Sequence, residues 1–121
     1  MEYSSTIRIP SATLPGVEFE VARMSFGRRL ELMKQVRELS QRREFFEAGA
    51  TPVDRMEAAL LSIEIDRLYW HWGLRAVRGL TLDAQAATAE SLWEQGPEDF
   101  TREVLAEIRA EAGLDDAERK N

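Results

Sequence analysis

Residues 51–73 constrain this sequence most, because their apolar side chains fall on two sides of one predicted helix. Thr51 can serve as its N-cap, Pro52 suits the first helical position, and Gly73 suits a left-handed C-cap. One stripe consists of Leu61, Ile65, Leu68 and Trp72, and a roughly opposite stripe consists of Met56, Ala59, Leu60, Ile63 and Trp70. A helix that is apolar on two sides needs neighbours on both. The sequence therefore predicts a central helix whose core residues are Leu61, Ile63, Ile65, Leu68, Trp70 and Trp72.

The flanking segments predict an α+β fold that is mostly α. Residues 6–9 and 17–21 are two short strand patterns separated by the turn signal Pro15-Gly16, which indicates a small N-terminal β-hairpin packed on an antiparallel helical core. A helix capped by Ser25 is predicted over residues 26–48, followed after a short loop by the central helix. Short extended pieces broken at Gly79 come next, then a turn or loop over residues 83–87. Two C-terminal helices are expected, over residues 89–95 and from Pro97 to Gly113.

The chain length favours a single domain over residues 1–121, with residues 1–5 and 114–121 flexible. Within it, the first two helices have more apolar surface than a hairpin and one later helix can easily cover. The predicted 26–48 helix has a short stripe and a long one. The short stripe is Phe26, Leu30 and Met33. We expect partner binding through the long stripe and a tryptophan of the 89–95 helix: Leu32, Val36, Leu39, Phe46 and Trp93.

Charge and composition exclude several classes of protein. The formal net charge is −6, which disfavours binding to nucleic acid or to an anionic membrane surface. The chain has no Cys, so disulfides and thiolate metal sites are ruled out. No apolar run approaches the roughly 18 residues of a membrane span, and the N-terminus lacks the pattern of a signal peptide. These features predict a protein of the cytoplasm that does not enter a membrane.

The sequence offers little for catalysis. His71 is the single histidine and lies among aromatic residues, where a structural role is the stronger interpretation. No Cys nucleophile, GxSxG motif, phosphate-binding glycine loop or metal-ligand spacing is present. Trp70, Trp72 and Trp93 could form an aromatic cage, but packing in a core or interface is the stronger reading. We therefore expect no enzyme activity, no cofactor and no metal.

Three stretches of this chain resemble small tail assembly chaperone-like proteins of tailed phages and prophages. They are VARMSFGRRLELMKQVRELSQRREFFEAG at 21–49, EIDRLYWHWGLRAVRGLTLD at 64–83, and ESLWEQGPEDFTREVLAEIRAEAGLDDAERKN at 90–121. The resemblance implies a non-enzymatic helper in the bacterial host cytoplasm that is absent from the mature virion. Such a protein coats the tape-measure protein during tail morphogenesis and presents it to tail-tube protein. Homo-oligomers would be compatible with this role.

Two other interpretations remain open. One is a structural connector or adaptor that stays in the virion. The other is a small DNA-binding regulator using the basic residues between Arg28 and Arg43, although the net acidity and the lack of a helix-turn-helix pattern oppose it. The resemblance also raises a question about the gene, because many such families make a longer product by ribosomal frameshifting. Lys120-Asn121 can be encoded by a slippery run, or can simply belong to a charged tail.

Overall fold

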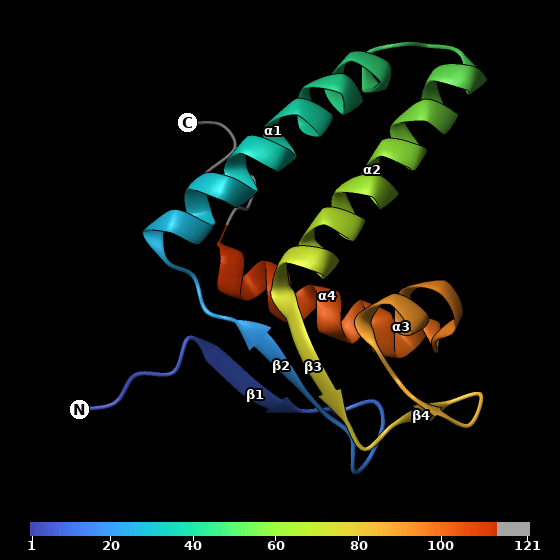
Figure 1. Ribbon diagram of the computed structural model, residues 1–121. Coiled ribbons are helices and arrows are strands. Elements are labelled where there is room, and N and C mark those ends of the chain that lie inside the picture. The colour runs from blue at the N-terminus through green and yellow to red at the C-terminus, as the bar shows by residue number, and fades with distance from the viewer. Residues whose placement is uncertain (114–121) are drawn as a thin grey trace. The chain divides into compact units, whose positions relative to one another are not determined.

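The protein has the α+β architecture that the sequence predicts. The computed structural model describes residues 1–113 of the 121-residue chain (Figure 1). In order, the elements are β1 (Thr6–Pro10), β2 (Glu18–Ala22), α1 (Phe26–Glu47), α2 (Pro52–Gly73), β3 (Leu74–Arg78), β4 (Thr81–Leu82), β5 (Gln85–Ala86), α3 (Ala89–Gln95) and α4 (Glu98–Ala112). The predicted flexible tail 114–121, with Lys120-Asn121, lies outside the described residues.

The described chain divides into two compact units. One unit is residues 25–69, which are α1 and most of α2. The other combines residues 1–24 with the chain from Trp70 onward, so it contains the last turn of α2, all strands, α3 and α4. The expectation of a single domain stays a prediction.

A three-stranded antiparallel sheet in the order β1-β2-β3 is the centre of the strand-containing unit. The predicted N-terminal hairpin is its β1-β2 part, with Ile9 opposite Phe19. Strand β3, which the sequence predicted only as an extended piece, pairs with the other edge of β2. Side chains alternate along β2, so that Phe19 and Val21 are fully buried while Glu20 lies on the opposite face.

Glu20 connects all three strands on that opposite face. Its carboxylate accepts a hydrogen bond from the Thr6 hydroxyl of β1 at 2.9 Å and lies 2.9 Å from Nη2 of Arg78 in β3. The hydrogen bond from Thr6, followed by that from Arg78, holds the pKa of Glu20 below its ordinary value. The outer face of the sheet is therefore held by a polar cross-strand cluster rather than by apolar packing.

Helix α4 packs on the inner face of the sheet. Phe100, Val104, Ile108 and Ala112, spaced four residues apart, are fully buried, and the ring of Phe100 meets that of Phe19 edge to face at 5.8 Å between centroids. The predicted single apolar face of this helix is thus confirmed, although Leu105 is only half-buried. Burial of these side chains removes their apolar surface from water and so stabilises this unit.

Two glutamates of α4 bind backbone groups at the two ends of β2. Glu103 accepts hydrogen bonds from the Ser11 hydroxyl at 2.7 Å and from the Ala12 N–H at 2.6 Å, in the loop that leads into β2. Glu111 accepts one from the Met24 N–H at 3.1 Å, just beyond the end of β2. Both contacts join segments about ninety residues apart in sequence. They fix the position of α4 along the sheet.

Three local features differ from the sequence prediction. Gly73 was expected to be a left-handed C-cap, but its φ is not positive and the chain passes directly from α2 into β3. Glycine is needed there because a Cβ would collide with Ile108 of α4. Residues 83–87 were expected to be a turn or loop, yet Gln85 and Ala86 form β5, paired with β4 across a two-residue turn. Pro97 caps α4 rather than beginning it.

The hydrogen bonds to Glu103 predict a pH-dependent contribution to stability. Burial raises the pKa of this carboxyl, but the bonds from Ser11, Ala12 and Thr13 outweigh that effect and hold the pKa below its ordinary value. A carboxyl with a depressed folded-state pKa stabilises the fold above the unfolded-state pKa of about 4.3. That contribution is lost as the pH falls through the folded-state pKa.

Glu103→Gln should therefore lower the free energy of unfolding by about 1–3 kcal/mol at pH 7, and by much less near pH 3. The measurement is urea unfolding at both pH values. Glu107→Gln, an exposed site on the same helix, is the matched control and should show little effect at either pH. A Glu103 variant with the same loss of stability at both pH values would contradict this account.

The close approach at Gly73 gives a second prediction. Gly73→Ala should destabilise the protein by about 1–3 kcal/mol, because Ile108 and the end of α2 must move apart. Gly27→Ala, in the first turn of α1, has no neighbouring atom within 4 Å and should be neutral or stabilise by up to about 1 kcal/mol. Thermal unfolding of both variants tests the difference, and equal melting temperatures would refute it.

Candidate interaction surface on the helical hairpin

Helices α1 and α2 form an antiparallel hairpin joined by a short turn (Figure 1). Each helix begins at the cap that the sequence predicts. The Ser25 hydroxyl accepts from the Arg28 N–H at 3.2 Å, while Thr51 and Asp54 exchange hydrogen bonds between side chain and backbone. Both helices are 22 residues long. The local sequence therefore determines where each helix begins, and the two helices on either side of the turn have equal lengths.

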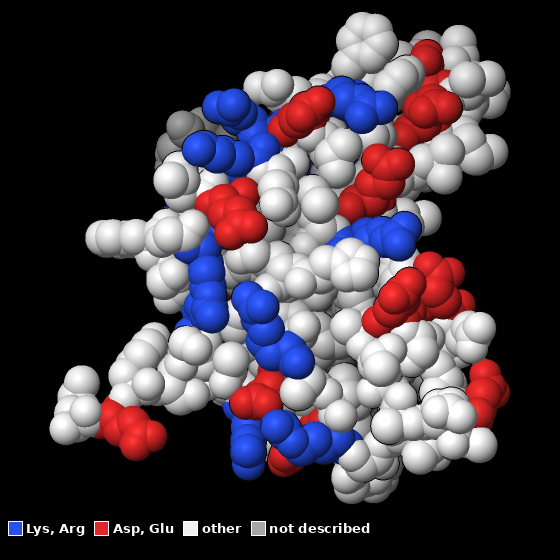
Figure 2. Space-filling view, in the orientation of Figure 1, with Lys and Arg blue, Asp and Glu red and all other residues white. Residues whose placement is uncertain are grey.

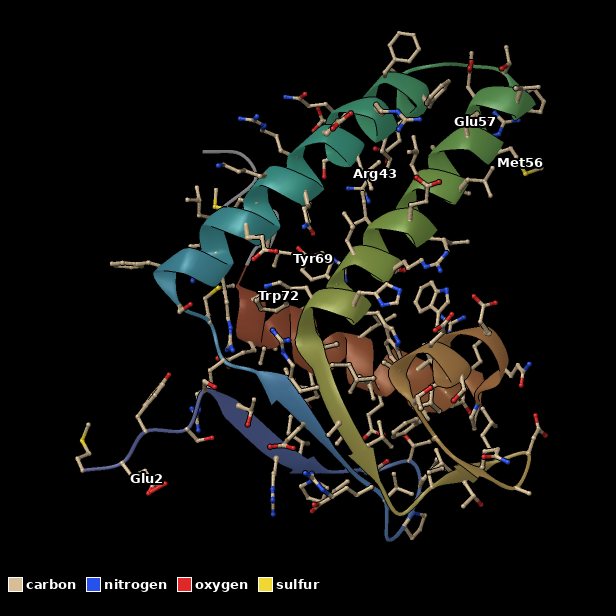
Figure 3. The ribbon with its side chains drawn as sticks, viewed as in Figure 1. Glu2, Arg43, Met56, Glu57, Tyr69 and Trp72 are labelled. Carbon is tan, nitrogen blue, oxygen red and sulfur yellow. The ribbon has the colours of Figure 1, made fainter. Side chains whose placement is uncertain are left out.

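Arg43 marks the sides of the two helices that face each other. Its guanidinium donates to the Ser62 hydroxyl of α2 at 3.4 Å, and its Nε lies 3.6 Å from a Glu47 carboxylate oxygen. The side chain is only 17% exposed, and Figure 3 shows it extending from α1 toward α2. At 3.6 residues per turn, Ser62 lies on the same half of α2 as the buried residues Leu61 and Ile65.

A second side of each helix is apolar and exposed. On α1 this side is formed by Phe26, Leu30 and Met33, which we call the α1 seam. On α2 it is formed by Val53, Met56, Leu60 and Ile63, which we call the α2 seam. Figure 3 shows Met56 projecting from the side of α2 that is turned away from α1. Adjacent leucines show the contrast, because Leu61 is 3% exposed and Leu60 is 49% exposed.

The α2 seam has the spacing of a helix-docking stripe. Its members follow one another at intervals of three, four and three residues, and those of the α1 seam at four and three. Alternating intervals of three and four place apolar side chains in a narrow line along a helix, as in the seam of a coiled coil. Phe45, also exposed, lies outside both seams near the end of α1, where its ring packs edge to face on Phe46 at 5.2 Å.

The structure corrects part of the predicted core. Leu61, Ile65, Trp70 and Trp72 are buried and Leu68 is half-buried, but Ile63 is 56% exposed and is not a core residue. The two-sided packing of α2 holds only at its C-terminal end. There, Trp70 donates from its indole nitrogen to the Ala89 carbonyl at 2.7 Å and contacts the ring of Trp93. Farther toward its N-terminus, the second stripe of α2 is exposed.

The residues expected to bind a partner are arranged differently from the prediction. Leu32 and Val36 are buried, and Leu39 and Phe46 are half-buried, so the long stripe of α1 is not an exposed binding surface. Trp93 belongs to the other compact unit and packs on Trp70. The short stripe of α1, together with the stripe of α2 assigned to the core, provides the exposed apolar surface instead.

The two helices of the hairpin carry net charges of opposite sign. Helix α1 carries six Lys or Arg against four Glu, a net charge of +2, and α2 carries four Asp or Glu against two Arg, a net charge of −2. Lys34 and Arg37 continue or border the α1 seam. Glu57 and Glu64 border the α2 seam, and Arg67, four residues after Ile63, continues it. Figure 2 shows acidic side chains along α2 and basic side chains over much of α1. Each seam is thus an apolar line with a charged border.

Other site types find little support within residues 1–113. This part of the chain contains no group of three or more His, Cys, Asp or Glu placed to hold a metal ion. None of its helices combines the length and apolar character needed to cross a membrane. His71 is exposed, outside both seams, and has an interaction partner. The exposed seams are therefore the best candidate for a functional surface.

Comparison of the chain with protein-family models, with curated proteins and with solved structures finds no match.

Adjacent positions on α2 give the third prediction. Leu61→Ala should lower the free energy of unfolding by about 2–5 kcal/mol, because it leaves a cavity at a buried site. Ile63→Ala should lower it by less than about 1 kcal/mol, because the side chain is more than half exposed. Urea unfolding of the dilute protein measures both. A large loss of unfolding free energy for Ile63→Ala at low protein concentration would contradict this account and show that Ile63 is a core residue.

Proposed function

We propose that this protein is a non-enzymatic tail assembly chaperone that binds the tape-measure protein of a tailed phage or prophage. The observation that carries the proposal is the exposed apolar surface of the helical hairpin. Between residues 4 and 113, all of the exposed large apolar side chains belong to α1 and α2: Phe26, Leu30, Met33, Phe45, Val53, Met56, Leu60 and Ile63. The resemblance described above supplies the identity of the client.

A chaperone of this kind needs an apolar surface that stays in solution. Apolar groups drive association with exposed stretches of a client, because contact removes both surfaces from water. Contiguous exposed apolar surface on a small protein is typical of interaction sites. The net charge of −6 keeps such a surface from driving nonspecific aggregation. A long helical client has apolar stripes of its own, which can pack along an exposed apolar stripe of this protein.

The tip of the hairpin is the part of this surface best suited to a first contact. Phe45 and Val53 lie near the two ends of the turn and are 73% and 70% exposed. Phe45 is held in place by its edge-to-face contact with Phe46. An exposed aromatic side chain with a fixed orientation offers a large contact area at a small entropic cost.

Co-expression with a phage tape-measure protein tests the function. We expect the chaperone to co-purify with the client and to raise the soluble fraction of the client several-fold. Phe45→Ser combined with Val53→Ser should reduce both effects without lowering thermal stability, because both side chains are exposed. Gln35→Ser and Gln41→Ser, at exposed polar sites on α1, form the matched control.

No co-purification and no gain in client solubility would refute the chaperone function. Mass spectrometry of mature phage particles adds an independent result. A chaperone is absent from them, whereas a stoichiometric amount would identify the protein as a virion connector instead.

A further inference from the structure

We propose that the α2 seam binds a client segment of one chemical class, an amphipathic helix that carries basic residues along one side of its apolar stripe. The inference rests on the proposed function and deepens it, because it assigns one surface of this chain to a kind of sequence that the client must contain.

The α2 seam is open along about three turns of helix, from Val53 to Ile63. Its four side chains are between 49% and 70% exposed. Helix α1 cannot cover them, because Ser62, the residue in contact with Arg43, lies about 140° around α2 from the middle of the seam. An elongated apolar partner can therefore pack along the seam from the solvent side.

Glu57 and Glu64 border one side of the α2 seam and are seven positions apart, which is about two turns of helix. Within residues 1–113, no side chain forms a hydrogen bond or ion pair with either carboxylate. Glu57 is half-buried and Glu64 is exposed. Two carboxylates without a basic neighbour, placed along one edge of an apolar line, favour a ligand that brings positive charge to that edge.

The partner that matches this border is a helix with two Lys or Arg residues seven positions apart beside an apolar stripe. That spacing places each basic group near one carboxylate whether the partner runs parallel or antiparallel to α2, because positions seven apart repeat on the same side of a packed helix. Apolar contact supplies most of the affinity, and the charge pairs select the partner and its register. The aliphatic stems of Lys and Arg add apolar contact at the edge of the seam.

A second copy of this chain fits the α2 seam poorly. The α2 seam lies next to the turn of the hairpin and the α1 seam lies at the far end of α1, so a two-fold axis along the helices cannot place one against the other (Figure 1). In an antiparallel pair of α2 helices, with Met56 opposite Leu60, the two Glu57 side chains lie on the same side of the contact, about 3 Å apart along it. In a parallel pair, Arg67 meets Arg67 of the second copy at the next core position. Each arrangement of two α2 helices therefore opposes like charges.

Two designed helical peptides test the chemistry of the partner. Both have leucines at alternating intervals of three and four residues; the basic peptide has lysines seven positions apart on its flanks, and the acidic peptide has glutamates there. The measurement is a methyl NMR titration of the full chain at about 0.15 M salt, where attraction between distant charges is screened. The basic peptide should shift the signals of Met56, Leu60 and Ile63, and should bind about tenfold more tightly than the acidic peptide.

Charge reversal shows whether the border of the seam makes this choice. Glu57→Lys combined with Glu64→Lys should reverse the preference, so that the acidic peptide binds more tightly. Glu31→Lys combined with Glu38→Lys is the matched control, because it makes the same change in net charge at two exposed positions seven apart on α1. This control should keep the wild-type preference.

A second pair of variants tests the apolar line. Leu60→Ser should weaken binding of the basic peptide about tenfold or more, because Leu60 lies in the middle of the α2 seam. Phe45→Ser removes an exposed apolar side chain outside the seam and should leave this affinity unchanged.

Equal affinity for the two peptides, or no binding of either up to about 1 mM, would overturn the proposal. So would a preference for the basic peptide that survives the reversal at Glu57 and Glu64. Sedimentation equilibrium of the protein alone gives a further check, because a dimer that Leu60→Ser removes would show that a second copy occupies the seam instead.

The peptides contain no tape-measure sequence, so the failure of this inference can be told apart from failure of the proposed function. Loss of the peptide preference with successful client co-purification would remove only the assignment of the α2 seam. A preserved peptide preference with no client co-purification would refute the tape-measure protein as the partner and leave the seam specific for a basic amphipathic helix.

Discussion

Helix α2 is apolar on two sides, and the structure depends on where both sides are packed against other elements. Both sides are packed only near the C-terminal end of the helix. There Trp70 is tied to Ala89 by its indole N–H and to Trp93 by ring contact, while Gly73 allows Ile108 to approach the helix backbone. Nearer its N-terminus, the same helix keeps Leu61 and Ile65 buried but leaves Leu60 and Ile63 exposed. Helix α2 is therefore buried on both apolar sides near its C-terminus, whereas nearer its N-terminus one side is buried and the other is exposed to solvent.

The strand-containing unit is stabilised by a different balance of interactions. Its inner face is apolar, with Phe19 and Phe100 in edge-to-face contact, and its ends are held by charged groups that accept backbone hydrogen bonds. Glu103 and Glu111 join segments that are distant in sequence, so they favour this one arrangement of α4 on the sheet. This unit offers no exposed large apolar side chain beyond Met1 and Tyr3 in its described residues. The capacity for apolar association therefore belongs to the helical hairpin.

Much of the fold could be predicted from sequence because its signals are local. Ser25, Thr51 and Thr88 cap the helices that follow them, and alternation in residues 17–21 identifies β2. The role of Gly73 could not be predicted, because it depends on Ile108, a residue far along the chain. The hydrogen bonds of Glu103 and Glu111 could not be predicted for the same reason, because their partners lie about ninety residues away in sequence.

The candidate surface was predicted less well. Periodicity identified both stripes of α2, but it cannot tell which stripe another element covers, and Ile63 was therefore placed in the core. On α1 the periodicity likewise shows two stripes without showing that the longer one, which includes Leu32 and Val36, is buried. The intervals of three, four and three from Val53 to Ile63 identify an apolar stripe, but the buried stripe from Leu61 to Trp72 has intervals of four, three and four, so spacing alone could not show which stripe is exposed.

The central claim is that the second side of α2 is open in the single chain, and solvent accessibility of individual methyl groups tests it most directly. The measurement is methyl NMR of the dilute protein with a soluble paramagnetic agent, with Ile, Leu and Met methyl groups labelled. The account predicts strong signal loss for Met56, Leu60 and Ile63, and protection of Leu61 and Ile65. Equal protection of Leu60 and Leu61 in a sample shown to be monomeric would contradict it.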